Sequence, residues 1–435
     1  MRDPFRNIYE LLLGEDDARA CKDISEDACR EQPKSFGIHV VATTLSKIGD
    51  GISDVKLTLT WVLASLGVPP MLVSWVVPLR ESLSLLPQLA FANQLRSFPK
   101  RKLFWTFGSI TQGLCIFAVG VASLFLKGAA AGYTILLLLA LFSLARGFCS
   151  IAGKDVLGKT VAKKKRGRVS GLATALAGFG TLVFGGFLYL ELIPTGNAAL
   201  LSGLLFFAGG LWLVAGIVYS GVPEFPGTTE GGRNGLREAL SSLKLIVTDR
   251  SLRHFLMTRC LFISTALVAP FYVILANRYT DGGMGTLGLL LFLAGLANLT
   301  SGTFWGKLAD HSSKHVLAVA GTICGLLALT VTLATTMEWP IIHRAEWYAA
   351  VIFVLYIGHA GVRLGRKTYL IDMATQDNRA QLVAVSNTFI GTVLLAIGGL
   401  STFVSRAGVL NAIAILGLFS FIAAISALAM KNVSD

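Results

Sequence analysis

Long apolar runs separated by short polar segments dominate this chain of 435 residues. Each run is about 20 residues long, which is enough to cross roughly 30 Å of hydrocarbon as an α-helix. Only helices and closed barrels satisfy their backbone hydrogen bonds within lipid, and these runs are too long for barrel strands and lack their two-residue alternation. With 54% hydrophobic residues and a mean hydropathy of +0.66, the chain is therefore predicted to be an all-α membrane protein.

We predict twelve transmembrane helices, which form two bundles of six. The predicted order is an acidic tail (1–34), an N-terminal bundle (35–220), a linker (221–250) and a C-terminal bundle (251–435). The predicted spans are 37–66, 69–94, 103–126, 132–157, 169–192, 198–220, 252–277, 284–306, 315–336, 346–371, 380–403 and 406–430.

The tail and the linker are the two polar parts of the chain. Charged tails are usually solvated, so a short solvated helix or disordered tail is the favoured interpretation. A plug or docking element against the basic loops is the alternative. Proline and glycine interrupt the linker, and 236–247 has the pattern of an amphipathic helix lying along the membrane surface. Cys21 and Cys29 in the tail are expected to be reduced, and no spacing of cysteine or histidine is typical of a metal site.

The formal charge of +13 follows the order of the loops. Lysine and arginine concentrate in alternate loops, such as 96–102, 163–168 and 233–253, whereas the loops between them hold few. This pattern places both termini in the cytoplasm. It also argues against nucleic-acid binding, because no soluble domain presents a basic patch. The first apolar span begins near position 37, so no signal peptide is evident, and we expect a protein of a bacterial inner (plasma) membrane.

Residues 93–186 recur at 306–399 without a gap, at a constant offset of 213 positions. Basic residues at span ends and glycines within spans recur in step. For example, Gly185 and Gly186 correspond to Gly398 and Gly399, and Arg166 corresponds to Arg379. Two similar halves in one apolar chain indicate a transporter built as a duplicated helical bundle.

The loop after the eighth span resembles the cytosolic loop motif of the major facilitator superfamily, Gly-x-x-x-Asp-Arg-x-Gly-Arg-Arg. Gly306, Asp310 and Lys314 match that motif, whereas the first-half counterpart has Ser97 in place of the aspartate. The resemblance implies that Asp310 caps a neighbouring helix and clamps the cytosolic side shut. Arg166 and Arg379 lie where the family often has an arginine, and we assign all five matching residues to a cytosolic gate: Gly306, Asp310, Lys314, Arg166 and Arg379.

Ser46-x-x-Gly49-Asp50 also resembles the opening of the first span in several exporter branches of the superfamily. The resemblance covers the apolar chain from about 37 to 430. It implies the superfamily fold without identifying a substrate, because one scaffold serves many solutes.

Ionisable residues at membrane depth are costly, so each one is a candidate for function. Lys47, Asp50 and Asp54 share one stripe of the first span, and Lys56 lies off that stripe. Counted from the outer hairpin, the following residues share one layer near the middle of the membrane: Asp50, Asp54, Arg80, Glu81 and Arg146.

The second half places His359 at the position equivalent to Arg146, and Arg363 lies one turn deeper. Arg366 and Lys367 are interpreted as residues of the cytosolic helix end, and Arg259 as a gate. We assign proton coupling to Asp50, Asp54 and Glu81. Substrate binding is assigned to Lys47, Arg80, Arg146, His359 and Arg363.

Structural ion pairs are the alternative interpretation of this layer, with Arg80 neutralising Asp54 and Glu81 pairing with Arg146. Cations slightly outnumber carboxylates in the layer, which favours an anionic or zwitterionic solute.

We therefore expect a monomeric, proton-coupled secondary transporter of a small organic solute, without a cofactor. A uniporter, an anion exchanger and a non-transporting receptor or assembly protein on the same scaffold remain alternatives. No nucleophile–base pair, phosphate loop or metal spacing indicates an enzyme.

Overall fold

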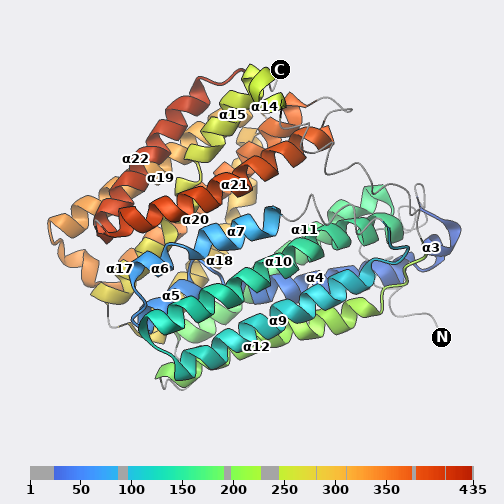
Figure 1. Cartoon of the computed structure of the whole chain (residues 1–435), viewed down its shortest axis with the longest axis horizontal. Helices are drawn as coiled ribbons and strands as arrows, with labels where there is room; N and C mark the ends of the chain where they lie inside the picture. The colour runs from blue at the N-terminus through green and yellow to red at the C-terminus, as the bar shows by residue number, and fades with distance from the viewer. Residues whose placement is uncertain are drawn as a thin grey trace.

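The protein is described from a computed structural model, which covers residues 24–86, 97–190, 197–226, 244–280, 282–309, 311–374, 379–406 and 408–433. All regular structure in these residues is helical, and the helices form two bundles that lie beside each other (Figure 1). Each bundle contains one copy of the sequence repeat.

The N-terminal bundle runs from blue to green in Figure 1. Its helices are α3 (Glu26–Arg30), α4 (Gln32–Ile52), α5 (Thr58–Ser65), α6 (Pro70–Val73), α7 (Val76–Leu85), α9 (Lys102–Phe125), α10 (Gly128–Thr160), α11 (Lys163–Tyr189) and α12 (Asn197–Ser220).

The C-terminal bundle runs from yellow to red in Figure 1. Its elements are α14 (Leu245–Thr248), α15 (Arg250–Leu261), α16 (Ser264–Leu267), α17 (Ala269–Tyr279), α18 (Met284–Ala309), α19 (Ser313–Thr336), the 3₁₀ helix η1 (Pro340–His343), α20 (Ala345–Met373), α21 (Arg379–Arg406) and α22 (Val409–Leu428).

The predicted helical membrane fold is confirmed. Within the described residues, nine helical segments are long and apolar enough to cross a membrane. The other three predicted spans correspond to α4 with α5, to α6 with α7, and to α21, whose apolar part is shorter.

Three spans that were predicted as continuous helices are broken. The first span stops at Ile52 and resumes at Thr58, because the side chains of Asp54 and Thr58 bond to the backbone of the break. The seventh span breaks at the equivalent position, where Pro270 opens α17. The second span breaks at Ser74, whose hydroxyl donates to the carbonyl of Met71.

Two predictions on the polar segments change. Part of the predicted tail is helical and packed, since α4 begins at Gln32 and the Gln32 side chain accepts the backbone N–H of Ala162 at 2.8 Å. Gln32 therefore packs against the N-terminal bundle, whereas the charged residues of α3 are exposed, and residues 1–23 lie outside the described residues. Cys29 is disulfide-bonded, so the prediction of a reduced thiol there was wrong.

Of the predicted amphipathic helix 236–247 in the linker, only 244–247 is described, and residues 245–247 belong to α14.

Glycines allow the two bundles to approach along two symmetry-related contacts. In the first contact, α11 packs on α18: a Cβ at Gly185 would lie 2.5 Å from the backbone nitrogen of Phe292. In the second contact, α21 packs on α7: a Cβ at Gly398 would lie 2.8 Å from the Trp75 ring. Since Gly185 and Gly398 are equivalent in the repeat, one packing device is used twice.

The two ends of the bundles differ. We call the end that holds Arg101, Lys163, Arg250 and Lys314 the basic end, and the opposite end the far end. At the far end α5 packs on α17, and Asn277 donates a hydrogen bond to Ser65 across the two bundles at 3.4 Å. These contacts close the far end.

Candidate functional site

A cavity of about 820 Å³ lies between the two bundles. Helices α4 and α11 of the N-terminal bundle line it, together with α15, α18, α20 and α21 of the C-terminal bundle. Its inner limit is at Asp54 and Leu57, in the break of the first span, and it extends to Ile371 and Val383 near the basic end. The cavity therefore lies on the basic side of the far-end closure.

Asp50 on α4 is held by two arginines from two other helices. One Nη of Arg146 on α10 donates to Asp50 Oδ1 at 2.5 Å, and its other Nη pairs with Oδ2, so the contact is bidentate. Arg80 on α7 donates to the same Oδ1 at 3.4 Å and lies over the Phe142 ring. Both arginines therefore contact Asp50, which corrects the pairings of Arg80 with Asp54 and of Arg146 with Glu81.

Asp54 lies within the break of the first span and joins the two bundles. Its Oδ1 accepts the backbone N–H groups of Lys56 at 2.8 Å and Leu57 at 3.0 Å. The same oxygen accepts the hydroxyl of Tyr356, on α20 of the other bundle, at 3.0 Å. One carboxylate thus shapes the first span and binds the opposite bundle.

A second contact between the bundles lies beside the first. Lys56 Nζ is 3.1 Å from Nε2 of His359, and Nδ1 of His359 is 3.0 Å from the Thr265 hydroxyl on α16. An ammonium group can only donate, so Nε2 accepts and the proton of a neutral His359 is on Nδ1, which donates to Thr265. His359 therefore bonds to both bundles and does not line the cavity among the residues described.

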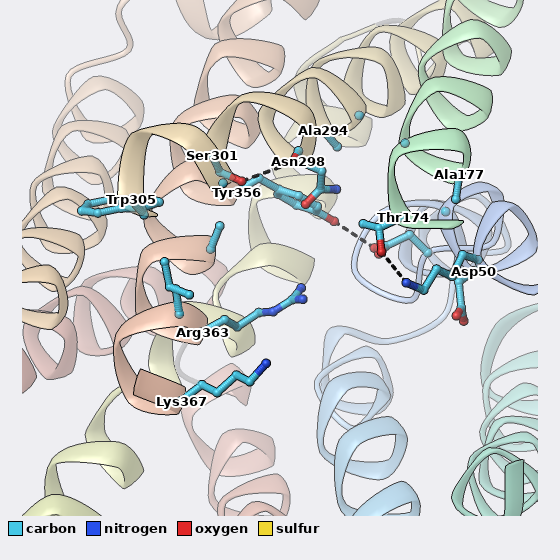
Figure 2. A pocket seen from close by; sticks show the side chains of 18 of the residues that line it. Asp50, Thr174, Ala177, Ala294, Asn298, Ser301, Trp305, Tyr356, Arg363 and Lys367 are labelled. Atoms are coloured by element: carbon cyan, nitrogen blue, oxygen red, sulfur yellow. Dashed lines mark hydrogen bonds between the residues drawn. The ribbon is translucent and has the colours of Figure 1, made fainter. Parts of the chain in front are cut away.

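The cavity wall itself is rich in cations. Arg363 and Lys367 on α20 extend into the cavity, opposite the side where Thr174 and Asp50 lie (Figure 2). Lys47 on α4 donates to the Thr174 hydroxyl at 2.5 Å.

Arg366 and Lys367 also line the cavity, although the sequence suggested only a role at the helix end. Arg259, predicted as a gate, lines the cavity while donating to Ser386 and Asn387 on α21.

Glu81 follows Arg80 on α7 and is half-buried. Its carboxylate lies in the electrostatic field of Arg80, Lys56 and Arg366. The field of the C-terminal bundle therefore reaches this residue of the N-terminal bundle.

The predicted cytosolic gate is only partly described. Asp310 and the side chain of Arg379 lie outside the described residues, so the predicted clamp stays a prediction. Arg166 donates to the carbonyls of Val161 and Gly158 at 2.8 and 2.7 Å, so it caps the end of α10 within its own bundle. Gly306 has no atom within 4 Å of an added Cβ, and Lys314 lies in the first turn of α19.

A charged cluster that the sequence did not predict lies at the basic end of the N-terminal bundle. The Glu224 carboxylate accepts the backbone N–H groups of Arg101 and Lys102 at 2.7–2.8 Å, and thereby caps α9. Lys159 bonds to Glu224 at 3.3 Å, and Arg101 pairs with Asp155 at 2.5 Å. Because Glu224 follows α12, this cluster ties the start of the linker to α9 and α10.

Neutral polar residues of the site were also missed by sequence reasoning. Tyr356, Thr174, Asn298 and Asn387 all line the cavity. Only Tyr356 carried a signal, since it lies one helical turn before His359 and so shares its face of α20.

Comparison with known proteins agrees with this architecture. The family model of the Major Facilitator Superfamily matches residues 40–345, and the chain belongs to this superfamily of transporters. No curated protein sequence matches the chain.

Among solved structures, a D-xylose-proton symporter superposes with a TM-score of 0.68 at 13% identity, covering 92% of this chain and 98% of the symporter. A POT family transporter in complex with 5-aminolevulinic acid has a TM-score of 0.68 at 10% identity, with 91% and 96% covered. The inward open xylose transporter XylE from E. coli has a TM-score of 0.66 at 12% identity, with 92% and 97% covered. Because the sequence identities are only 10–13%, these similarities show that the chain shares the fold of these proteins and no more.

Proposed function

We propose that the protein is a secondary active transporter that moves a small anionic or zwitterionic organic solute by alternating access, coupled to protons. The observation that carries this proposal is the charged cavity between two pseudo-symmetric bundles, closed at the far end and extending toward the basic end. The positive-inside pattern favours a cytoplasmic basic end, so this cavity would face the cytoplasm.

Alternating access requires that the far-end contacts break while the bundles stay associated. The contacts to be broken are the packing of α5 on α17 with the Asn277–Ser65 hydrogen bond. Nearer the cavity, the hydrogen bonds Asp54–Tyr356 and Lys56–His359 must break as well, since each joins one bundle to the other. The two glycine contacts, at Gly185 and Gly398, lie on α11 and α21 and are the natural pivots, because at both glycines an added Cβ would lie less than 3 Å from an atom of the opposite bundle.

Asp50 is the first candidate for the coupling proton. As a carboxylate it binds Arg146 and Arg80 together. Protonation would remove the charge that holds both guanidinium groups, and a released Arg146 could then bind an anionic group of the solute. Asp54 is the second candidate, because a proton there would weaken its bond to Tyr356 and so the far-end closure. Glu81 is the third candidate for the coupling proton, because its carboxylate lies in the electrostatic field of Arg80, Lys56 and Arg366.

The test is transport in proteoliposomes, with the solute first identified by a thermal-shift screen of metabolites at two pH values. With a proton gradient, the wild type should accumulate the solute, whereas Asp50→Asn should lose accumulation and keep solute exchange. Asp54→Asn is measured in parallel, and Glu338→Gln in the exposed far-end turn before η1 is the control.

If Asp50→Asn and Asp54→Asn both accumulate solute as the wild type does, the coupling assignment is wrong. Counterflow that proceeds at the same rate after the gradient is collapsed, with no gradient-driven accumulation, would instead identify a uniporter or an anion exchanger.

A further inference from the structure

The charge on the cavity wall is strongly unbalanced. Among the described residues that line the cavity, two are carboxylates, Asp50 and Asp54. Five are cations, namely Lys47, Arg259, Arg363, Arg366 and Lys367. The excess is larger than the slight surplus expected from the sequence.

The two carboxylates offset only part of this positive charge. Asp50 is already paired with two arginines, Arg80 and Arg146. Asp54 Oδ1 is used by two backbone N–H groups and by Tyr356. Glu81 adds a third carboxylate, in the field of Arg363 and Arg366, but Arg80, Arg146 and Lys56 are three further cations around the cavity. An excess of positive charge is therefore left for a ligand to offset.

Two of the five cations are placed on one face of α20. Arg363 and Lys367 are four residues apart, so they lie one helical turn from each other, and both extend into the cavity (Figure 2). Within the described part of the chain neither forms a salt bridge. Lys47 lies on the opposite bundle, where it is attracted by Asp50 and repelled by Arg146 and, more weakly, by Arg363.

We propose that the transported solute is a compact dianion, a dicarboxylate or a phosphate monoester, bound between Lys47 of the N-terminal bundle and Arg363 with Lys367 of the C-terminal bundle. This inference rests on the proposed transport function and narrows its substrate class. A monoanion would leave most of the excess charge uncompensated at membrane depth, where unpaired charge is costly. A zwitterion would bring a cation of its own, for which no uncommitted carboxylate lines the described cavity wall.

The chemistry of the wall fits such a ligand. The planar guanidinium of Arg363 matches the geometry of a carboxylate or phosphate, and the ammonium groups of Lys47 and Lys367 add point charges on either side. Hydroxyl and amide groups of Thr174 and Asn298 line the same space and can bond to an ester or a hydroxyl. A dianion seated there binds cations of both bundles at once, so its binding favours their approach at the basic end.

The experiment measures calorimetric binding to the purified full-length protein. One set of probes has equal length and differs in charge: succinate, its monoamide succinamate and 4-aminobutyrate. The second pair is glycerol 3-phosphate and glycerol. We expect at least one dianion to bind at least tenfold more tightly than its matched monoanion, zwitterion or neutral compound. Succinate alone would identify a dicarboxylate, glycerol 3-phosphate alone a phosphate monoester, and both a site for compact dianions.

The variants Arg363→Gln and Lys367→Gln should each weaken dianion binding at least tenfold. Arg278→Gln, in the same bundle but exposed at the far end, is the matched control and should bind as the wild type does. The proposal is overturned if neither dianion binds, if every dianion that binds does so no more tightly than its matched monoanion, zwitterion or neutral compound, or if both cavity variants bind as the wild type does. If a monoanion or zwitterion is nevertheless exchanged in proteoliposomes, the transport function stands without the dianion; if no solute is exchanged, both proposals fail.

Discussion

The repeat-related glycines allow a test of the bundle contacts by single-methyl substitutions. In Gly185→Ala the new Cβ would lie 2.5 Å from the backbone nitrogen of Phe292 and 2.9 Å from its Cα. Carbon atoms pack at about 3.5 Å or more, so α11 and α18 must separate by about 1 Å. Overpacking of this kind typically costs about 1–3 kcal/mol.

The neighbouring glycines supply the controls. An added Cβ at Gly186 has its nearest contact at 3.7 Å, and one at Gly399 has no atom within 4 Å. Every Gly→Ala change in a helix brings the same gain in helix propensity, about 1 kcal/mol, so this gain cancels within each pair. Gly185→Ala should therefore be about 1–3 kcal/mol less stable than Gly186→Ala. Gly398→Ala should be destabilised less, because it meets the Trp75 and Pro78 side chains at 2.8 and 2.9 Å rather than backbone.

The assay is thermal unfolding of the purified variants, followed by solute exchange in proteoliposomes. Gly185→Ala should unfold several degrees below Gly186→Ala and exchange solute several-fold more slowly, because the contact it widens is a proposed pivot. Gly398→Ala and Gly399→Ala should show the same order. Identical unfolding and exchange within both pairs would refute the inference that close packing at Gly185 and Gly398 holds the bundles together.

Two other substitutions test the remaining contacts. Tyr356→Phe removes a hydrogen bond to the Asp54 carboxylate, and bonds to charged groups contribute about 1.5–3 kcal/mol, so the far-end closure should weaken by tenfold or more. Faster hydrogen–deuterium exchange in α5 and α17 would show this, and unchanged exchange would contradict it. Glu224→Gln replaces a fully buried carboxylate that caps α9 and should destabilise the protein by about 2–3 kcal/mol in chemical denaturation, whereas Glu338→Gln should change stability by less than about 0.5 kcal/mol. Equal stability of the two variants would exclude a structural role for Glu224.

The fold could be predicted because two patterns in the sequence, the apolar runs and the internal repeat, extend over long segments. Runs of about 20 apolar residues require helices in lipid, and the offset of 213 positions requires two similar bundles. The breaks in the first and second spans could not be predicted in the same way. They arise where the side chains of Asp54, Thr58 and Ser74 bond to nearby backbone groups, and this competition depends on a local geometry that hydropathy does not register.

The depth of the charged residues in the membrane could be predicted from the sequence, but the ion pairs that they form could not. Counting residues from the hairpin placed Asp50, Arg80 and Arg146 at one level, and the structure brings these three into contact. The choice of Asp50 over Asp54 as their partner depends on the rotation of each helix about its axis, which a residue count does not give. Neutral partners such as Tyr356 were missed because a search for charges cannot detect them.

The glycine contacts also bear on the route by which a solute can reach the cavity. On one side of the cavity α11 meets α18, and on the other α21 meets α7, each through packing too close to admit even one added methyl group without displacement. A lipid tail therefore has no side entrance between the bundles at these levels. If the protein transports a solute as proposed, we expect compounds partitioned into the bilayer to be poor substrates compared with solutes that arrive from water. Detergents and lipophilic drugs should accordingly fail to compete with a water-soluble substrate for its site.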